Sequence, residues 1–259
     1  MIFKMGLRRM IRQILLLIFI EALIFIPSCM YIFSVSGVAV YVPDGYTLIV
    51  PEDLQLLLPL GDSTALILMC MRLVYFVSCV FLMIYGALSL SRDAASGKIE
   101  FLLVRPTSRS AIFTQRLIMG LITVVFSWAA MYTLGAAALY AAKPGASLLD
   151  ADGYEILAFS LRALGIEAML FLLSYMWSSI CRTRTSAVCA SLLCFFGAYT
   201  LGIFPQVVEK LWITSYFSPY HFAFDGTLNW IKPTIAGVLA LVSLVIGAVV
   251  YKRSQFYEM

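Results

Sequence analysis

The sequence predicts an all-α polytopic membrane protein, and three observations support this fold class. Hydrophobic residues fill 62% of the 259 positions, while charged residues fill only 12%. The mean hydropathy is +0.95, so the chain has more apolar surface than a soluble domain of this size can bury around one core. The apolar residues also form long runs, and about 20 of them in a helix cross a bilayer. We expect a single transmembrane domain over residues 1–259.

Six of these runs are long enough to be membrane-spanning helices. Residues 2–13 place apolar and basic side chains on separate helical stripes, which favours a helix in the cytoplasmic interface or, equally, a basic flank that only sets topology. In the sixth run, Ser243 and Gly247 are small residues four apart, which allows close helix packing. The predicted elements are an interfacial helix at 1–13 and spans at 14–35, 64–90, 117–142, 155–180, 185–204 and 231–251.

The orientation of the spans follows from Lys and Arg. Thirteen of these residues fall on the side that holds both termini, against three on the other side. Cytoplasmic loops carry an excess of Lys and Arg, so both termini are expected in the cytoplasm. This asymmetry also accounts for the net charge of +4, and no nucleic-acid partner is expected. The thirteen are Lys4, Arg8, Arg9, Arg12, Arg92, Lys98, Arg105, Arg109, Arg116, Arg182, Arg184, Lys252 and Arg253.

The segment from about 205 to 230, on the outer side, is rich in Trp, Tyr and Phe, as expected at the level of lipid headgroups. We expect short extracytoplasmic helices there, before the sixth span. Its His221 is the only histidine of the chain, which excludes the H-E-x-x-H pattern of zinc proteases. The six cysteines form no CxxC pair. We therefore assign no catalytic residue and no metal ligand.

Residues 91–109, "SRDAASGKIEFLLVRPTSR", form the longest charged stretch. From Asp93 to Leu103 the apolar residues share one helical face, and Pro106 ends the pattern because the residue before a proline avoids the helical region. Thr107 or Ser108 can cap the helix that follows. This pattern favours a short amphipathic cytoplasmic helix through which a soluble partner could push on the second and third spans. A solvated connector is the simpler alternative.

This stretch resembles the E-x-x-x-G-T-x-E-x-L-L-x-x-P-V-S-R segment that follows the second span in permeases of ATP-binding-cassette (ABC) type 2 transporters. Asp93, Lys98 and Thr107 depart from the pattern, and Asp93 keeps a carboxylate. "YFSPYHFAFDG" near the sixth span and the basic "VVYKRSQF" after it are similar to further segments of that family, so the resemblance covers nearly the whole chain. The matching positions in the first segment are Gly97, Glu100, Leu102, Leu103, Pro106, Ser108 and Arg109.

The resemblance implies a coupling helix at residues 93–103 that contacts a separate ATP-binding subunit. Asp93 and Glu100 would face donors of that subunit, Gly97 belongs to the same motif, and Arg105 and Arg109 would hold the turn. The implied assembly has two ATP-binding subunits, which bind ATP and Mg²⁺, and a second permease copy or paralogue. This chain has no G-x-x-x-x-G-K-[ST] loop, so it is not expected to be the ATPase itself or to carry a cofactor.

Four charged residues lie inside predicted spans: Glu21, Arg72, Arg162 and Glu167. A charge at the centre of a span costs about 2.5–3.5 kcal/mol on insertion scales, so each needs a structural or functional reason. Arg72 and Arg162 are near enough to the outer ends of their spans to extend toward water. Pairing across helices, for example Glu167 with Arg72, is the structural interpretation. A polar translocation surface is the functional one.

The sequence thus favours the permease of an ABC exporter in the cell membrane of a prokaryote. The expected cargo is an amphipathic or lipophilic solute, such as a drug, a peptide antibiotic or a lipid-like molecule. A proton-coupled secondary transporter that uses Glu21 and Glu167 is the second hypothesis, although it gives no reason for the 91–109 helix. An intramembrane enzyme with a dyad built on His221 is the third.

Overall fold

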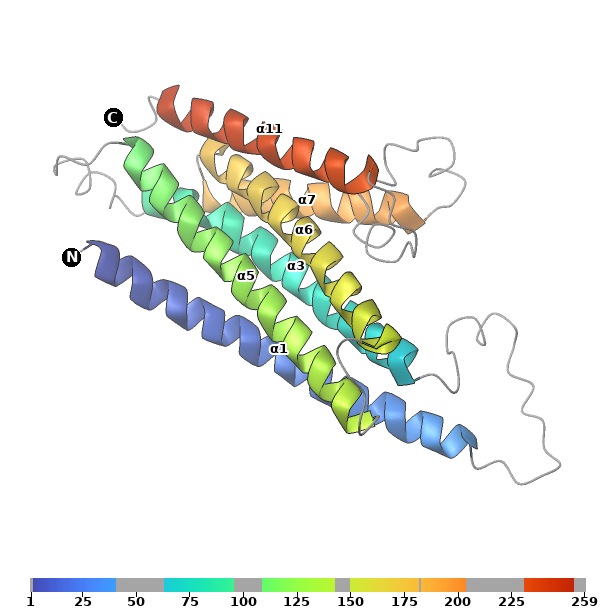
Figure 1. The fold of residues 1–259 in the computed structure, drawn as a ribbon. Helices are drawn as coiled ribbons and strands as arrows, with labels where there is room; N and C mark the ends of the chain where they lie inside the picture. Colours follow the sequence, from blue (N-terminus) through green and yellow to red (C-terminus); the bar gives the residue numbers. More distant parts are fainter. Residues whose placement is uncertain are drawn as a thin grey trace.

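The computed structural model describes residues 2–40, 63–95, 109–142, 150–181, 183–203 and 231–253. Every regular element in these ranges is a helix, which confirms the all-α prediction for this part of the chain. Figure 1 shows the helices running side by side in one bundle, with the N- and C-termini at the same end. The helices are α1 (Ile2–Val40), α3 (Ser63–Ala95), α5 (Arg109–Ala142), α6 (Ala151–Ile180), α7 (Arg184–Ile203) and α11 (Ile231–Arg253).

Four of these helices are long and apolar enough to cross a membrane. Their apolar segments are Met10–Met30 in α1, Leu66–Ser91 in α3, Ser110–Ala142 in α5 and Gly153–Ile180 in α6. Helix α7 contains a shorter apolar segment, Arg184–Gly197. The described residues therefore support a polytopic helical membrane protein, while spanning by α7 and α11 remains a prediction.

The helix boundaries differ from the predicted elements in two places. The predicted interfacial helix at 1–13 and the first span are parts of one continuous helix, α1, which also contains Pro27. Spanning helices tolerate an internal proline because neighbouring groups satisfy the freed carbonyl. Helix α3 continues to Ala95, so the first residues of the predicted coupling helix extend the helix of the second span. The predicted outer helices at 205–230 lie outside the described residues.

Helix α6 lies at the centre of the packing and contacts α3, α5, α7 and α11. Its largest fully buried side chains are Phe171 and Tyr175. The ring of Phe171 stacks on Tyr85 of α3 at 6.2 Å between centroids. Helix α1 instead packs against α3 and α5. Helices α3 and α5 therefore each pack against both α1 and α6, and these four helices carry the polar groups described below.

Small residues bring α6 close to three neighbours. A Cβ added at Gly86 of α3 would collide with the Ser174 side chain, and one at Gly120 of α5 would collide with the Phe171 ring. On α11, a Cβ at Gly247 would lie 3.3 Å from the Met176 Cα, and Ser243 is buried. The prediction that the small residues of the sixth run allow close packing is confirmed.

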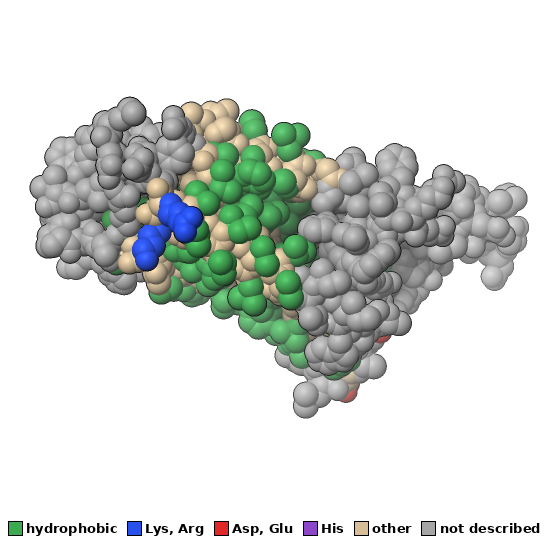
Figure 2. Space-filling model, turned by 90° about the horizontal axis from the view of Figure 1, so that it is seen from above, with side chains coloured by type: hydrophobic (Ala, Val, Ile, Leu, Met, Phe, Trp, Pro, Cys, Tyr) green, Lys and Arg blue, Asp and Glu red, His purple; other side chains and the backbone are tan. Residues whose placement is uncertain are grey.

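The outer surface of the bundle carries apolar side chains. Figure 2 shows one face with hydrophobic side chains over its middle and Lys and Arg side chains gathered toward one end. Lys252 and Arg253, in the last turn of α11, are exposed. Such an apolar surface with basic residues at one end fits a bilayer and its headgroups. The exposed large apolar side chains include Leu15, Phe19, Leu23 and Met30 of α1 and Leu241, Val245 and Val249 of α11.

Candidate functional site

The described residues contain a buried polar cluster to which four helices contribute. On α1 the buried positions recur every three or four residues, which is the spacing of one helical face. Glu21 occupies one of these positions, between Leu17 and Phe25, and is 0% exposed. The helix therefore turns this carboxylate toward the interior of the bundle, while the neighbouring Phe19 and Leu23 face outward.

Two serine hydroxyls hold the Glu21 carboxylate. Ser78 of α3 donates a 2.8 Å hydrogen bond to Glu21 Oε1, and Ser127 of α5 donates a 2.7 Å bond to the same oxygen. Both serines are buried. The second oxygen, Oε2, has no hydrogen-bond partner among the described residues. Glu21 thus joins three helices and keeps one oxygen available.

Glu167 of α6 completes the cluster as a second buried carboxylate. It is 0% exposed, and neither of its oxygens accepts a hydrogen bond from a described residue. It interacts electrostatically with Glu21 and also with the Ser127 hydroxyl. Both glutamates that the sequence placed inside spans are therefore brought together. Burial without hydrogen bonds is costly for a polar group, so this carboxyl group needs a compensating partner.

Helix α3 adds two further groups beside Glu167. Tyr75 and Cys79 are buried, and both interact electrostatically with Glu167. The Tyr75 hydroxyl interacts with the Cys79 thiol and has no oxygen or nitrogen hydrogen-bond partner among the described residues. Its ring packs edge-on against Phe159 at 6.2 Å. Tyr75, Ser78 and Cys79 follow the i, i+3, i+4 spacing of one helical face. That spacing was the available signal for these residues, which the sequence analysis did not single out.

The arginines inside the predicted spans lie apart from this cluster. Arg72 is exposed and Arg162 is partly exposed. Because the Glu167 oxygens accept no hydrogen bond from a described residue, the predicted pairing of Glu167 with Arg72 is wrong. Arg72 is exposed and Tyr75 is buried, although residues three apart lie on neighbouring parts of a helix surface. The edge of the buried face of α3 therefore passes between them.

Two of the predicted coupling residues, Asp93 and Arg109, lie at the end of the bundle that also holds both termini. Asp93 lies in the last turn of α3, and Arg109 is the first residue of α5. Figure 1 places the end of α3 and the start of α5 at this end. Gly97, Glu100 and Arg105 lie outside the described residues. Their predicted contact with an ATP-binding subunit stays a prediction.

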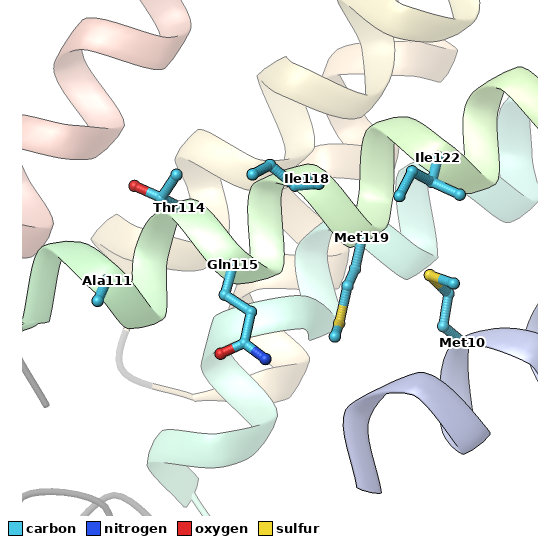
Figure 3. Close-up of a pocket in the computed structure, with 7 residues that line it drawn as sticks. All are labelled: Met10, Ala111, Thr114, Gln115, Ile118, Met119 and Ile122. Carbon is cyan, nitrogen blue, oxygen red and sulfur yellow. The ribbon is translucent and has the colours of Figure 1, made fainter. Parts of the chain in front are cut away.

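A groove lies between α1 and α5. Its cavity volume is about 380 Å³. In Figure 3, Met10 of α1 extends toward α5, and Gln115 and Met119 project from α5 on the side of α1. The flexible Met side chains suit a surface that adapts to ligands of varied shape. The lining residues are Met10, Ala111, Thr114, Gln115, Ile118, Met119 and Ile122.

The described residues contain no group of three or more His, Cys, Asp or Glu side chains that could hold a metal ion. Their cysteines are all free thiols.

Comparison of the chain with models of known protein families found no match, and comparison with curated proteins found none either. The class that the fold and site define is therefore a polytopic helical membrane protein with a buried polar cluster.

Proposed function

We propose that this chain is the membrane-spanning permease subunit of an ABC exporter in the cell membrane of a prokaryote. The observation that carries the proposal is the 91–109 segment, whose motif resembles the coupling helix of type 2 permeases. This segment connects α3 with α5. A partner that pushes on it acts directly on two helices of the polar cluster.

The energy source in this proposal is a separate ATP-binding subunit, present in two copies with bound ATP and Mg²⁺. Asp93, Gly97, Glu100, Arg105 and Arg109 form the contact with it. A second permease copy or paralogue completes the assembly. The two spans assigned to α7 and α11 bring the number of spans to six. An even number places both termini on the same side of the membrane, and the excess of Lys and Arg assigns that side to the cytoplasm.

The proposed cargo is an amphipathic or lipophilic solute. The groove between α1 and α5 supports this choice because its lining is mostly apolar, with Thr114 and Gln115 as polar groups. It lies near the start of α5, at the end of the bundle assigned to the cytoplasm. A solute dissolved in the inner leaflet could therefore reach the groove from the side.

The test is to co-express the chain with the ATPase encoded beside it and to purify through a tag on the chain. We expect an active ATPase to co-purify with wild type and to be lost with Glu100→Arg. The matched control is Glu155→Arg, an exposed charge reversal on α6 at the opposite end of the bundle. If Glu100→Arg retains the ATPase as wild type does, the coupling assignment is wrong.

The buried glutamates favour a second candidate, a proton-coupled secondary transporter. Glu21 and Glu167 share one cluster, and buried ionisable residues in spans often belong to proton pathways. This candidate predicts transport by the purified chain without any ATPase, driven by a pH gradient across liposomes. Transport that requires the ATPase and ATP contradicts it.

A further inference from the structure

The polar cluster has more acceptor oxygens than donors. The described donors to its carboxylates are the hydroxyls of Ser78 and Ser127. Both bind Glu21 Oε1, and Ser127 also interacts with Glu167. Glu21 Oε2 and both oxygens of Glu167 have no hydrogen-bond partner there. Two adjacent carboxyl groups of this kind repel each other when both are charged, and burial strengthens the repulsion.

Tyr75 is a separate sign that something is bound in the cluster. Its hydroxyl is buried, has no oxygen or nitrogen hydrogen-bond partner among the described residues, and interacts with the Cys79 thiol and with Glu167. Buried polar groups in native proteins have partners as a rule, and each exception needs a cause such as a bound ion. Oxygens from a tyrosine of α3, a glutamate of α1 and a glutamate of α6 therefore lack partners in the same small region.

The size of the cluster limits the ligand. Glu21, Ser78 and Glu167 are each 0% exposed, and close-packed interiors leave voids little larger than a water molecule. An organic ammonium group on a transported solute is too large for such a space. A small cation with one positive charge and a preference for oxygen ligands matches the charge of the cluster and a void of this size.

We propose that Glu21, Glu167 and Tyr75 form a buried binding site for one small monovalent cation, either a proton or an alkali-metal ion. Ser78 and Ser127 are positioning residues, because their hydroxyls hold the Glu21 carboxylate in place. The ion joins α1 to α6, and its release separates their carboxylates by repulsion. The site thus gives the helix bundle a cation-dependent arrangement. This proposal rests on the described polar cluster and does not depend on the proposed ATPase partner.

The groups that face the two carboxylates come from each helix of the cluster. Helix α3 supplies Tyr75, Ser78 and Cys79, while α5 supplies Ser127. These four side chains are neutral hydroxyl, phenol or thiol groups at neutral pH. No Lys or Arg is among the described groups that act on the two carboxylates, so in this proposal the bound ion supplies the positive charge.

The test is thermal unfolding of the purified full chain in detergent micelles, with NaCl or KCl replacing choline chloride at constant ionic strength and pH. For an alkali-metal ion we expect a midpoint that rises with its concentration and saturates, because a ligand that binds only the folded state stabilises it. Glu21→Gln and Glu167→Gln should abolish the shift. Glu155→Gln, an exposed carboxylate on α6, should retain it.

Tyr75→Phe keeps the ring and its packing against Phe159 and removes one oxygen, so it is a milder test of the site than the glutamate variants. We expect the apparent affinity of this variant for Na⁺ or K⁺ to fall about 3- to 10-fold, which is the effect of one lost hydrogen-bonding group. The proton is tested in choline buffer alone by varying pH. In that buffer, the thermal unfolding midpoint of wild type and of Glu155→Gln should change with pH. The double variant Glu21→Gln/Glu167→Gln should not show this change.

Each outcome decides the matter. A saturable response to Na⁺ or K⁺ that the glutamate variants lose assigns an alkali-metal ion, and a pH response alone that the double variant loses assigns a proton. If the wild-type midpoint responds to neither, or if the double variant responds as wild type does, the proposal is overturned. Failure of ATPase co-purification with a normal cation response would contradict only the proposed function.

Discussion

The hydroxyl of Tyr175 donates a 2.7 Å hydrogen bond to the backbone carbonyl of Phe113 and so joins α6 to α5. The rings of the same residues lie 4.9 Å apart between centroids. The Tyr251 ring of α11 lies 5.6 Å from Phe113. Three helices are therefore held together near the end of the bundle assigned to the cytoplasm.

Tyr175→Phe should lower the free energy of unfolding by about 0.5–1.5 kcal/mol, the net worth of one buried hydrogen bond. The rings remain, so their packing is retained. Tyr154→Phe on the same helix is the control, because Tyr154 is exposed and surface substitutions stay within about 0.5 kcal/mol. Denaturant unfolding in micelles measures both. Equal effects would mean that the bond to Phe113 adds nothing to stability.

Ser127→Ala should be more costly, because it leaves a buried carboxylate oxygen with one donor instead of two. We expect a loss of about 1–3 kcal/mol in the free energy of unfolding. Thr133→Ala is the matched control on α5, since the exposed Thr133 hydroxyl bonds to Ala130 within its own helix. A loss from Ser127→Ala no larger than that from Thr133→Ala would contradict the hydrogen-bond account of Glu21.

Gly120→Ala should destabilise the bundle by about 1–3 kcal/mol through overpacking. The added methyl meets the ring of Phe171, which is 0% exposed and stacks against Tyr85 and Tyr175. Gly165→Ala is the opposite case, because no atom lies within 4 Å of its added Cβ. There, the helix gains about 0.5–1 kcal/mol from alanine's higher propensity. The unfolding midpoint should therefore fall below that of wild type in Gly120→Ala and rise above it in Gly165→Ala.

The next prediction concerns the groove between α1 and α5, and it rests on the proposed export function. Ile118→Trp should fill the groove and weaken solute binding about tenfold, since a misfitting bulky group costs 1 kcal/mol or more. Val125→Trp is a matched control on the same helix, because Val125 is 50% exposed, Ile118 is 51% exposed, and only Ile118 lines the groove. ATP-dependent transport of a fluorescent amphiphile into inverted vesicles measures the difference. Equal transport by both variants would remove the groove from the pathway.

The helices could be predicted because long apolar runs have a single physical solution in a bilayer, where backbone groups must bond within the segment. The apolar segments of α1, α3, α5 and α6 were predicted for this reason. The sequence did not indicate that the helix continues without a break from residue 13 to residue 14. A basic, amphipathic start to a spanning helix gives the same pattern whether the chain bends at the interface or continues, as α1 does.

The candidate site was only half predictable. Glu21 and Glu167 stand out in the sequence because charges are rare in apolar runs. Their partners are ordinary serines and a tyrosine, and these matter only because of how each helix is rotated. Arg72 and Tyr75 are three residues apart, yet one is exposed and the other is buried. Lateral packing decides such rotations, and the sequence of one span contains little information on its neighbours.

The position of Glu21 in the first helix has a consequence for synthesis. Its hydrogen-bond donors follow 57 and 106 residues later in the chain. At about 5–20 residues per second, Ser127 leaves the ribosome about 5–20 s after Glu21. During that interval this acidic residue has to wait without its partners, either held at the insertion machinery or near the membrane surface. The first helix should therefore be retained beside the translocon until the third arrives, and shortening the chain before Ser127 should leave it poorly inserted.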